Sequence, residues 1–93
     1  MTDQRILIVE DESGIAETLV FSLSSEGFST VHVSSGGEAF SLFSGDESGF
    51  SLIIIDIGLP DISGFELIKK IRSFSQIPIL CLTARIDEID RVL

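Results

Sequence analysis

The sequence predicts an α/β fold, in which helices cover both faces of a doubly wound parallel sheet. Short apolar runs rich in β-branched residues alternate with segments whose apolar residues recur at helical spacing. Most of these runs are continuous, which is typical of strands buried on both faces. The first and third runs are followed directly by an acid, and the fourth is followed by Thr83. At 93 residues, the chain is long enough for one domain of this kind.

Four segments are expected to be strands. Residues 5–9 read Arg-Ile-Leu-Ile-Val, and residues 51–55 read Ser-Leu-Ile-Ile-Ile, which is the strongest apolar run. Residues 28–33 alternate apolar and polar side chains, as an edge strand would. Residues 78–82 contain the lone cysteine, Cys81, which we interpret as a small buried hydrophobe because a single cysteine excludes a disulfide framework.

Helices are expected between the strands. Ser13 is expected to cap the first helix, and Gly27 lies just past its end, where a left-handed residue stops helices. The side chains that we expect on its buried face are Ile15, Ala16, Leu19, Val20 and Leu23.

The next two helices begin with pairs at capping-box spacing. The pairs are Ser35 with Glu38 and Ser63 with Glu66. A fourth helical segment starts at Ile86. The order β-α-β-α-β-α-β-α, with short connections, implies parallel strands and crossover helices.

The composition narrows the class of function. Fifteen acidic against six basic side chains give a formal net charge of −9, which argues against direct contact with nucleic acid. The N-terminus lacks a signal-peptide pattern, and no apolar run approaches the length of a membrane span. The sequence therefore predicts a cytoplasmic protein without membrane contact.

Acids lie where the predicted strands end. Glu10 and Asp11 follow the first strand, Asp56 follows the third, and Thr83 follows the fourth. Carboxyl ends of parallel strands meet at one edge of the sheet, where doubly wound folds bind ligands. If the first and third strands are neighbours, three carboxylates and a hydroxyl share one small pocket. The alternative is that such acids only cap helices, and for Glu12 we favour it.

A divalent cation would offset the repulsion between these carboxylates. Mg²⁺ suits oxygen ligands and takes one or two carboxylates while keeping several waters. A carboxylate beside such a cation can attack phosphorus, and the cation can neutralise charge on the transferred phosphoryl group. The pattern therefore indicates a magnesium site capable of phosphoryl transfer.

The loop after Asp56 is also informative. Pro60 fixes a turn, and Gly64 allows tight packing or unusual backbone angles near the start of the next helix. A rigid turn would direct the carbonyl of Gly58 into the pocket as a further oxygen ligand. A plain connecting loop explains the same residues equally well.

Three blocks of this sequence resemble the signature blocks of the response regulator receiver family. They are residues 6–12 (Ile-Leu-Ile-Val-Glu-Asp-Glu), residues 56–64 and residues 82–85 (Leu-Thr-Ala-Arg), in the family's order and at its separations. The resemblance covers the whole chain and is strongest to the OmpR/PhoB class, including the CreB-type regulators. It implies the flavodoxin/CheY-like receiver fold with strand order 2-1-3-4-5.

The resemblance also implies a role for each site residue. Asp56 would accept a phosphoryl group from a phosphohistidine on a sensor histidine kinase, in a step that the receiver itself catalyses. Asp11 and Asp56 would bind Mg²⁺ through their side chains, Gly58 through its carbonyl and Glu10 mainly through water. Thr83 would be the switch hydroxyl, and Ala84 would leave room for the phosphoryl group. His32 matches no such role, so we interpret it as an edge-strand side chain.

The chain departs from the family at its C-terminal end. Residues 1–93 are expected to be a receiver domain that lacks the fifth strand, its lysine and the fifth helix. Contact with DNA would require a C-terminal domain that this chain does not contain. The fourth strand would then be an uncovered hydrophobic edge, which predicts low stability, a homodimer or a strand-exchanged oligomer.

Three rival functions compete with this interpretation. A haloacid-dehalogenase-like phosphatase needs an acid two residues after the nucleophile, where this chain has Gly58. A flavodoxin-like nucleotide binder needs a phosphate loop after the first strand, but residues 10–12 are acidic. A phosphate-independent interaction module stays open, because the family's lysine is missing.

Overall fold

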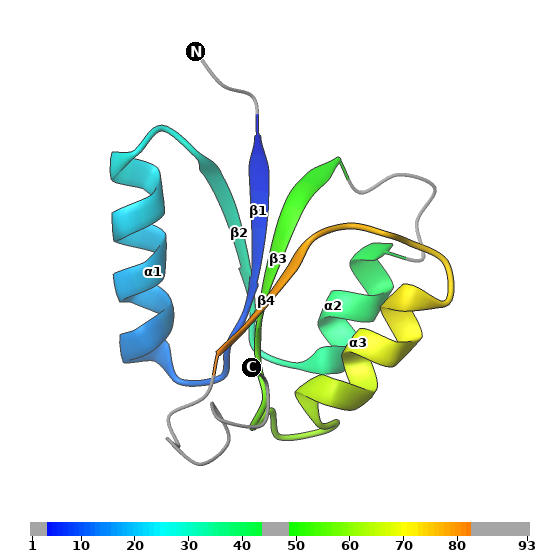
Figure 1. Cartoon of the computed structure of the whole chain (residues 1–93). Coiled ribbons are helices and arrows are strands. Elements are labelled where there is room, and N and C mark those ends of the chain that lie inside the picture. Colours follow the sequence, from blue (N-terminus) through cyan, green and yellow to red (C-terminus); the bar gives the residue numbers. More distant parts are fainter. Residues whose placement is uncertain (1–3, 44–48, 83–93) are drawn as a thin grey trace.

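The computed structural model describes residues 4–43 and 49–82 (Figure 1). Four strands alternate with three helices in this part of the chain. The elements are β1 (Arg5–Val9), α1 (Ser13–Ser25), β2 (Ser29–Val33), α2 (Gly36–Phe43), β3 (Phe50–Asp56), α3 (Gly64–Arg72) and β4 (Ile79–Leu82). Among these residues, no helix is long and apolar enough to cross a membrane.

All four strands belong to one parallel sheet with the order β2-β1-β3-β4. This order confirms the predicted doubly wound receiver fold. β2 lies at one edge of the sheet, as its alternating sequence predicted. β1 lies between β2 and β3, with Ile8 opposite His32 on one side and Val9 opposite Ile55 on the other.

The helices cover both faces of the sheet. α1 packs on one face, and α2 and α3 pack on the other (Figure 1). Because successive side chains of a strand point to opposite faces, the sheet contributes to two apolar clusters. Ile6, Ile8 and Ile54 meet Leu19, Val20 and Leu23 of α1. Leu7, Val9, Ile53 and Ile55 meet Ala39 of α2 and Leu67 and Ile71 of α3.

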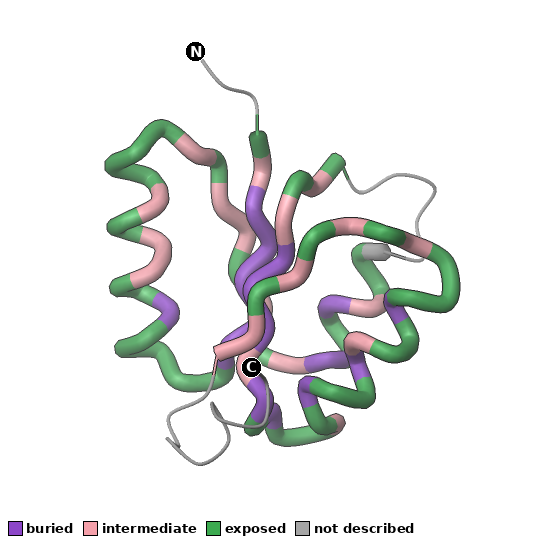
Figure 2. The backbone as a smooth tube through the Cα atoms, in the orientation of Figure 1, coloured by how far each residue is buried: buried purple, intermediate pink, exposed green. Residues whose placement is uncertain are grey.

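Burial is concentrated in the two central strands (Figure 2). The side chains of Leu7, Ile8, Ile53 and Ile55 are fully buried. Burying an aliphatic side chain of this size contributes roughly 1.5–3 kcal/mol. The central strands therefore form the rigid platform at whose carboxyl end the acidic residues lie.

The first helix begins and packs slightly differently from expectation. The predicted cap at Ser13 is wrong, because Ser13 is the first helical residue and Glu12 occupies the N-cap position without a side-chain capping bond. Ala16 donates its backbone N–H to the carbonyl of Glu12. Ile15 is 40% exposed and lies outside the buried face. Gly27 has a φ of 95°, which confirms the predicted left-handed helix stop.

The other two helices start with bonds close to those predicted. The Oγ of Ser35 accepts the N–H of Glu38 at 3.2 Å, and the carboxylate of Glu38 reaches back to the N–H of Ser34 at 2.8 Å. Ser63 caps α3, but its Oγ accepts from Phe65 at 3.1 Å rather than from the residue after it. The predicted fourth helix from residue 86 lies outside the described residues.

Candidate metal and phosphoryl-transfer site

β1 and β3 end side by side, and their carboxyl ends bring three acids together. The chain passes from β1 to β2 on one side and returns to β3 on the other, so the strand order reverses between β1 and β3. Such a reversal opens a crevice at the carboxyl edge. One carboxylate oxygen each of Glu10, Asp11 and Asp56 lies within 4.8 Å of the others at this edge.

Glu10 is the buried member of the cluster. It is 2% exposed, and its Oε2 accepts the backbone N–H of Glu12 at 3.0 Å. Burial raises the pKa of Glu10, and the N–H of Glu12 partly opposes that rise. The charge of Asp56, a side-chain hydrogen bond to Asp56 and the charge of Asp11 raise the pKa of Glu10 further. The negative charge of Glu10 is therefore disfavoured by its surroundings.

The other two carboxylates are open to ligands. Asp11 is exposed and Asp56 is half-buried. Asp56 accepts the backbone N–H of Gly58 through Oδ1 at 3.3 Å. Hard oxygen atoms from three carboxylates, which lie within 4.8 Å of one another, are a donor set that fits a hard divalent cation. Such a cation would offset the negative charge that the three carboxylates share.

The loop from Asp56 to Gly64 is closed tightly at its base. Gly64 donates its N–H to the carbonyl of Ile57 at 2.9 Å. A Cβ added at Gly64 would lie 2.6 Å from the carbonyl oxygen of Asp56 and 2.7 Å from the Cα of Ile57. Glycine at position 64 therefore lets the start of α3 approach the backbone of the acidic residue. Pro60 is exposed in the same loop.

Gly58 differs from Gly64. A Cβ added at Gly58 would have no neighbour within 4 Å, and the φ of Gly58 is not positive. The backbone at this position thus accommodates any side chain. Its contribution to the site would come from main-chain atoms, as the sequence suggested for a carbonyl ligand.

Two predicted site residues, Thr83 and Ala84, lie outside the described residues. The neighbouring Leu82 ends β4 opposite Asp56, and Ile57 donates its N–H to the carbonyl of Leu82 at 3.0 Å. The carboxyl end of β4 is therefore at the same edge as the three acids.

Sequence reasoning missed the role of His32. Its exposed ring reaches from β2 to the end of β1, where Nε2 donates to the carbonyl oxygen of Glu10 at 2.7 Å. His32 therefore lies on an edge strand, as predicted, and in addition contacts the backbone of a site residue. The contact follows from the register of β1 and β2. Ile8 lies opposite His32, and Glu10 is two residues farther along the chain from Ile8.

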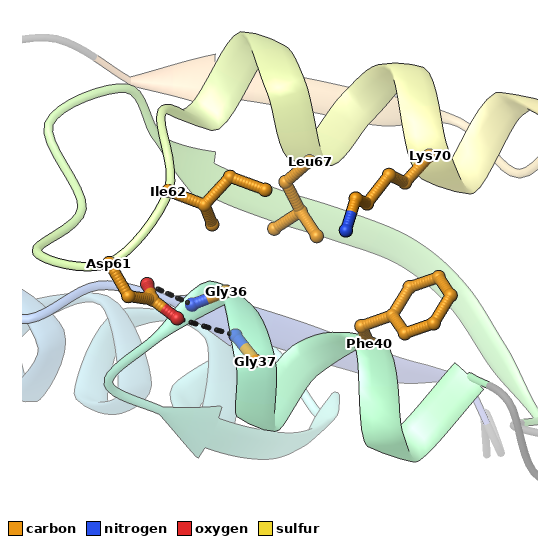
Figure 3. Close-up of a pocket in the computed structure, with 7 residues that line it drawn as sticks. All are labelled: Gly36, Gly37, Phe40, Asp61, Ile62, Leu67 and Lys70. Atoms are coloured by element: carbon orange, nitrogen blue, oxygen red, sulfur yellow. Dashed lines mark hydrogen bonds between the residues drawn. The ribbon is translucent and has the colours of Figure 1, made fainter.

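Sequence reasoning also missed Asp61. Its carboxylate accepts the backbone N–H of Gly36 at 2.9 Å through one oxygen and that of Gly37 at 2.9 Å through the other (Figure 3). These two N–H groups lower the pKa of Asp61. No local pattern identifies this pair, since the partners are 25 residues apart in sequence.

A parallel sheet covered by helices on both faces, with acidic side chains at the point where the strand order reverses, defines a class of doubly wound α/β domains that bind ligands at this edge. Within this class, the sequence model of the response regulator receiver domain matches residues 6–92. The chain belongs to this family.

Relatives among characterised proteins are transcriptional and sensory regulators. The sensory transduction protein RegX3 of Mycobacterium tuberculosis is 40% identical over 88 residues, which are 95% of this chain and 38% of RegX3. The transcriptional regulatory protein CreB of Escherichia coli is 44% identical over 94 residues, covering 100% of this chain and 40% of CreB. The chain thus spans about two fifths of the length of these relatives.

Solved structures agree with the family. The response regulator TrrA of Thermotoga maritima, in complex with Mg²⁺-BeF, has a TM-score of 0.83 and 37% identity over 94% of this chain and 75% of its own. The same regulator in complex with the histidine kinase ThkA has a TM-score of 0.79 and 38% identity over 87% of this chain and 69% of its own.

Proposed function

We propose that this chain is a phosphoacceptor switch that takes a phosphoryl group onto Asp56 in a reaction that depends on Mg²⁺. Asp11 and Asp56 would hold the cation through their carboxylates, Gly58 through its carbonyl and Glu10 through water. When bound, Mg²⁺ supplies the positive charge that offsets the phosphoryl oxygens. The Oδ of Asp56 forms the new bond to phosphorus, and the donor histidine nitrogen leaves with the bonding electrons.

The observation that carries this proposal is the cluster of Glu10, Asp11 and Asp56 within 4.8 Å. Its position at the reversal of strand order supports the same assignment. The raised pKa of Glu10 supports it as well, because crowded carboxylates need a positive partner once they ionise. Outside the described residues, Thr83 would bind a phosphoryl oxygen, and Ala84 would leave room beside it.

The proposal extends to partners and location. The chain would act in the cytoplasm, and its phosphoryl donor would be a phosphohistidine of a sensor histidine kinase. The related regulator TrrA, which forms a complex with the histidine kinase ThkA, supports this choice of partner. Residues 1–93 would belong to one receiver domain. Contact with DNA would belong to a further domain, as in regulators such as CreB. The chain would catalyse only its own phosphorylation and dephosphorylation.

Incubation with acetyl phosphate and Mg²⁺ tests this function. Intact-mass spectrometry is expected to show a phosphoryl adduct on the wild type, none on Asp56→Asn and none after removal of Mg²⁺ with EDTA. Glu17→Gln serves as a control that removes an exposed acid from α1, away from the cluster. An adduct that persists in Asp56→Asn contradicts the assignment. No adduct and no Mg²⁺ binding in the wild type would favour the phosphate-independent interaction module.

A further inference from the structure

The loop after Asp56 is held at its apex as well as at its base. At the base, the N–H of Gly64 binds the carbonyl of Ile57 at 2.9 Å. At the apex, Asp61 binds the first two N–H groups of α2 through both carboxylate oxygens (Figure 3). The loop that presents Asp56 and Gly58 is therefore tied to a helix from another part of the chain.

The contact completes the N-terminus of α2. The first N–H groups of a helix have no partner inside it. Here those of Gly36 and Gly37 bind Asp61, and that of Glu38 binds the Oγ of Ser35. The N–H of Ala39 then binds the carbonyl of Ser35. Two of the three side-chain-bound N–H groups thus depend on a residue of the β3–α3 loop.

The two glycines allow this close approach. Gly36 is buried, and a Cβ added there would overlap the Cγ2 of Ile62. A Cβ added at Gly37 would lie 3.3 Å from the Oδ2 of Asp61. The loop and the first turn of α2 therefore fit each other closely. They form one end of a cavity of about 290 Å³ between α2 and α3, with Lys70 at the other end (Figure 3).

We propose that Asp61 is a positioning residue, which fixes the loop that follows Asp56 and carries Gly58 by anchoring it to the N-terminus of α2. This inference rests on the proposed magnesium and phosphoryl site. Two charge-assisted bonds at 2.9 Å hold the apex of the loop, in addition to the backbone bond at its base. A loop fixed before the cation binds loses less entropy on binding, which favours Mg²⁺ affinity.

The coupling is reciprocal by thermodynamic linkage. If the anchor strengthens Mg²⁺ binding, then Mg²⁺ must strengthen the anchor by the same factor. Saturating Mg²⁺ is therefore expected to slow hydrogen exchange of the Gly36 and Gly37 amides in the wild type. This readout needs no variant.

Calorimetric titration with Mg²⁺ tests the anchor, since the chain has no Trp or Tyr for a fluorescence signal. Asp61→Ala is expected to weaken Mg²⁺ binding about three- to tenfold, within the range reported for coupled residues away from a ligand. Asp61→Asn keeps an acceptor oxygen and is expected to lie between Asp61→Ala and the wild type. It serves as the working variant if Asp61→Ala does not fold.

Glu38→Ala is the matched control. It removes one negative charge and one capping bond from the same end of α2, the 2.8 Å bond to Ser34, without touching the loop. Equal Mg²⁺ affinities for the Asp61 and Glu38 variants, or unchanged exchange of the two glycine amides on adding Mg²⁺, would overturn the inference. A wild type without Asp56-dependent Mg²⁺ binding would instead overturn the proposed function.

Discussion

At the scale of single residues, Glu10 and Asp61 have opposite electrostatic surroundings. Burial and the nearby charge of Asp56 raise the pKa of Glu10, so the ionised form of this carboxylate is disfavoured. The N–H groups of Gly36 and Gly37 lower the pKa of Asp61, so this carboxylate is favoured when ionised. The two residues therefore predict opposite dependences of stability on pH.

For Glu10, stability is expected to fall as the pH rises. The folded state binds this proton more tightly than the unfolded state, so the contribution is complete below the ordinary value of 4.5 and is lost through the raised pKa. Without Mg²⁺ at neutral pH, Glu10→Gln is expected to be more stable than the wild type, because it removes a charge that burial disfavours. Urea unfolding in EDTA from acid to neutral pH measures this. Parallel pH profiles of wild type and variant would contradict it.

For Asp61, stability is expected to fall as the pH drops. Its contribution is present above the ordinary value of 3.8 and is lost as the pH falls through the lowered pKa. Asp61→Asn is therefore expected to melt at a lower temperature than the wild type at neutral pH and to depend less on pH in acid. Thermal melting by circular dichroism tests this, with Glu66→Gln as an exposed control on α3. The prediction would be wrong if the melting temperature of Asp61→Asn fell in acid as steeply as that of the wild type.

At the scale of elements, the approach of α3 to β3 depends on one glycine. Gly64 begins α3 against the backbone of Asp56 and Ile57, whereas Gly58 in the same loop has open space where a Cβ would be. Both are glycines in one loop, but only Gly64 is required by packing. This contrast offers a matched pair of substitutions.

Gly64→Ala is expected to destabilise the fold by about 1–3 kcal/mol, since the new methyl would press on main-chain atoms that cannot rotate away. Gly58→Ala is expected to change stability by no more than about 0.5 kcal/mol, as is usual for exposed positions. The free energy of unfolding in urea measures both. If the two variants lost similar amounts of unfolding free energy, close contact with the β3 backbone would not explain why position 64 requires glycine.

At the scale of the whole molecule, β4 is the edge of the described sheet. Among residues 4–43 and 49–82, β4 pairs with β3 alone, and its Leu80 is 51% exposed. Exposed apolar edges can pair with other chains. The predicted homodimer or strand-exchanged oligomer stays a prediction that this edge motivates.

Leu80→Lys tests that prediction. A charge on the edge strand opposes pairing, so the variant is expected to sediment as a monomer at concentrations where the wild type self-associates. Sedimentation velocity over a dilution series measures this, with Phe21→Lys on α1 as a control at another exposed apolar residue. A wild type that stays monomeric throughout would refute the expectation.

The sequence alone determined the fold and the acidic cluster. Apolar runs such as residues 51–55 predict buried strands, and their alternation with helices leaves few topologies. Glu10, Asp11 and Asp56 follow strands that such a topology ends at one edge, so their proximity could be predicted without coordinates. Capping was predicted less well, because Glu12 rather than Ser13 occupies the N-cap of α1. Helix ends shift by a residue at small energetic cost.

Only the tertiary structure decided how His32 and Asp61 contribute. His32 reaches Glu10 across 22 residues of sequence, and Asp61 reaches Gly36 across 25. Periodicity and capping patterns describe neighbours along the chain, whereas these contacts depend on strand register and on how a loop meets another helix. The exposure of Ile15 and the differing needs of Gly58 and Gly64 were decided in the same way, by which atoms the folded chain places beside them.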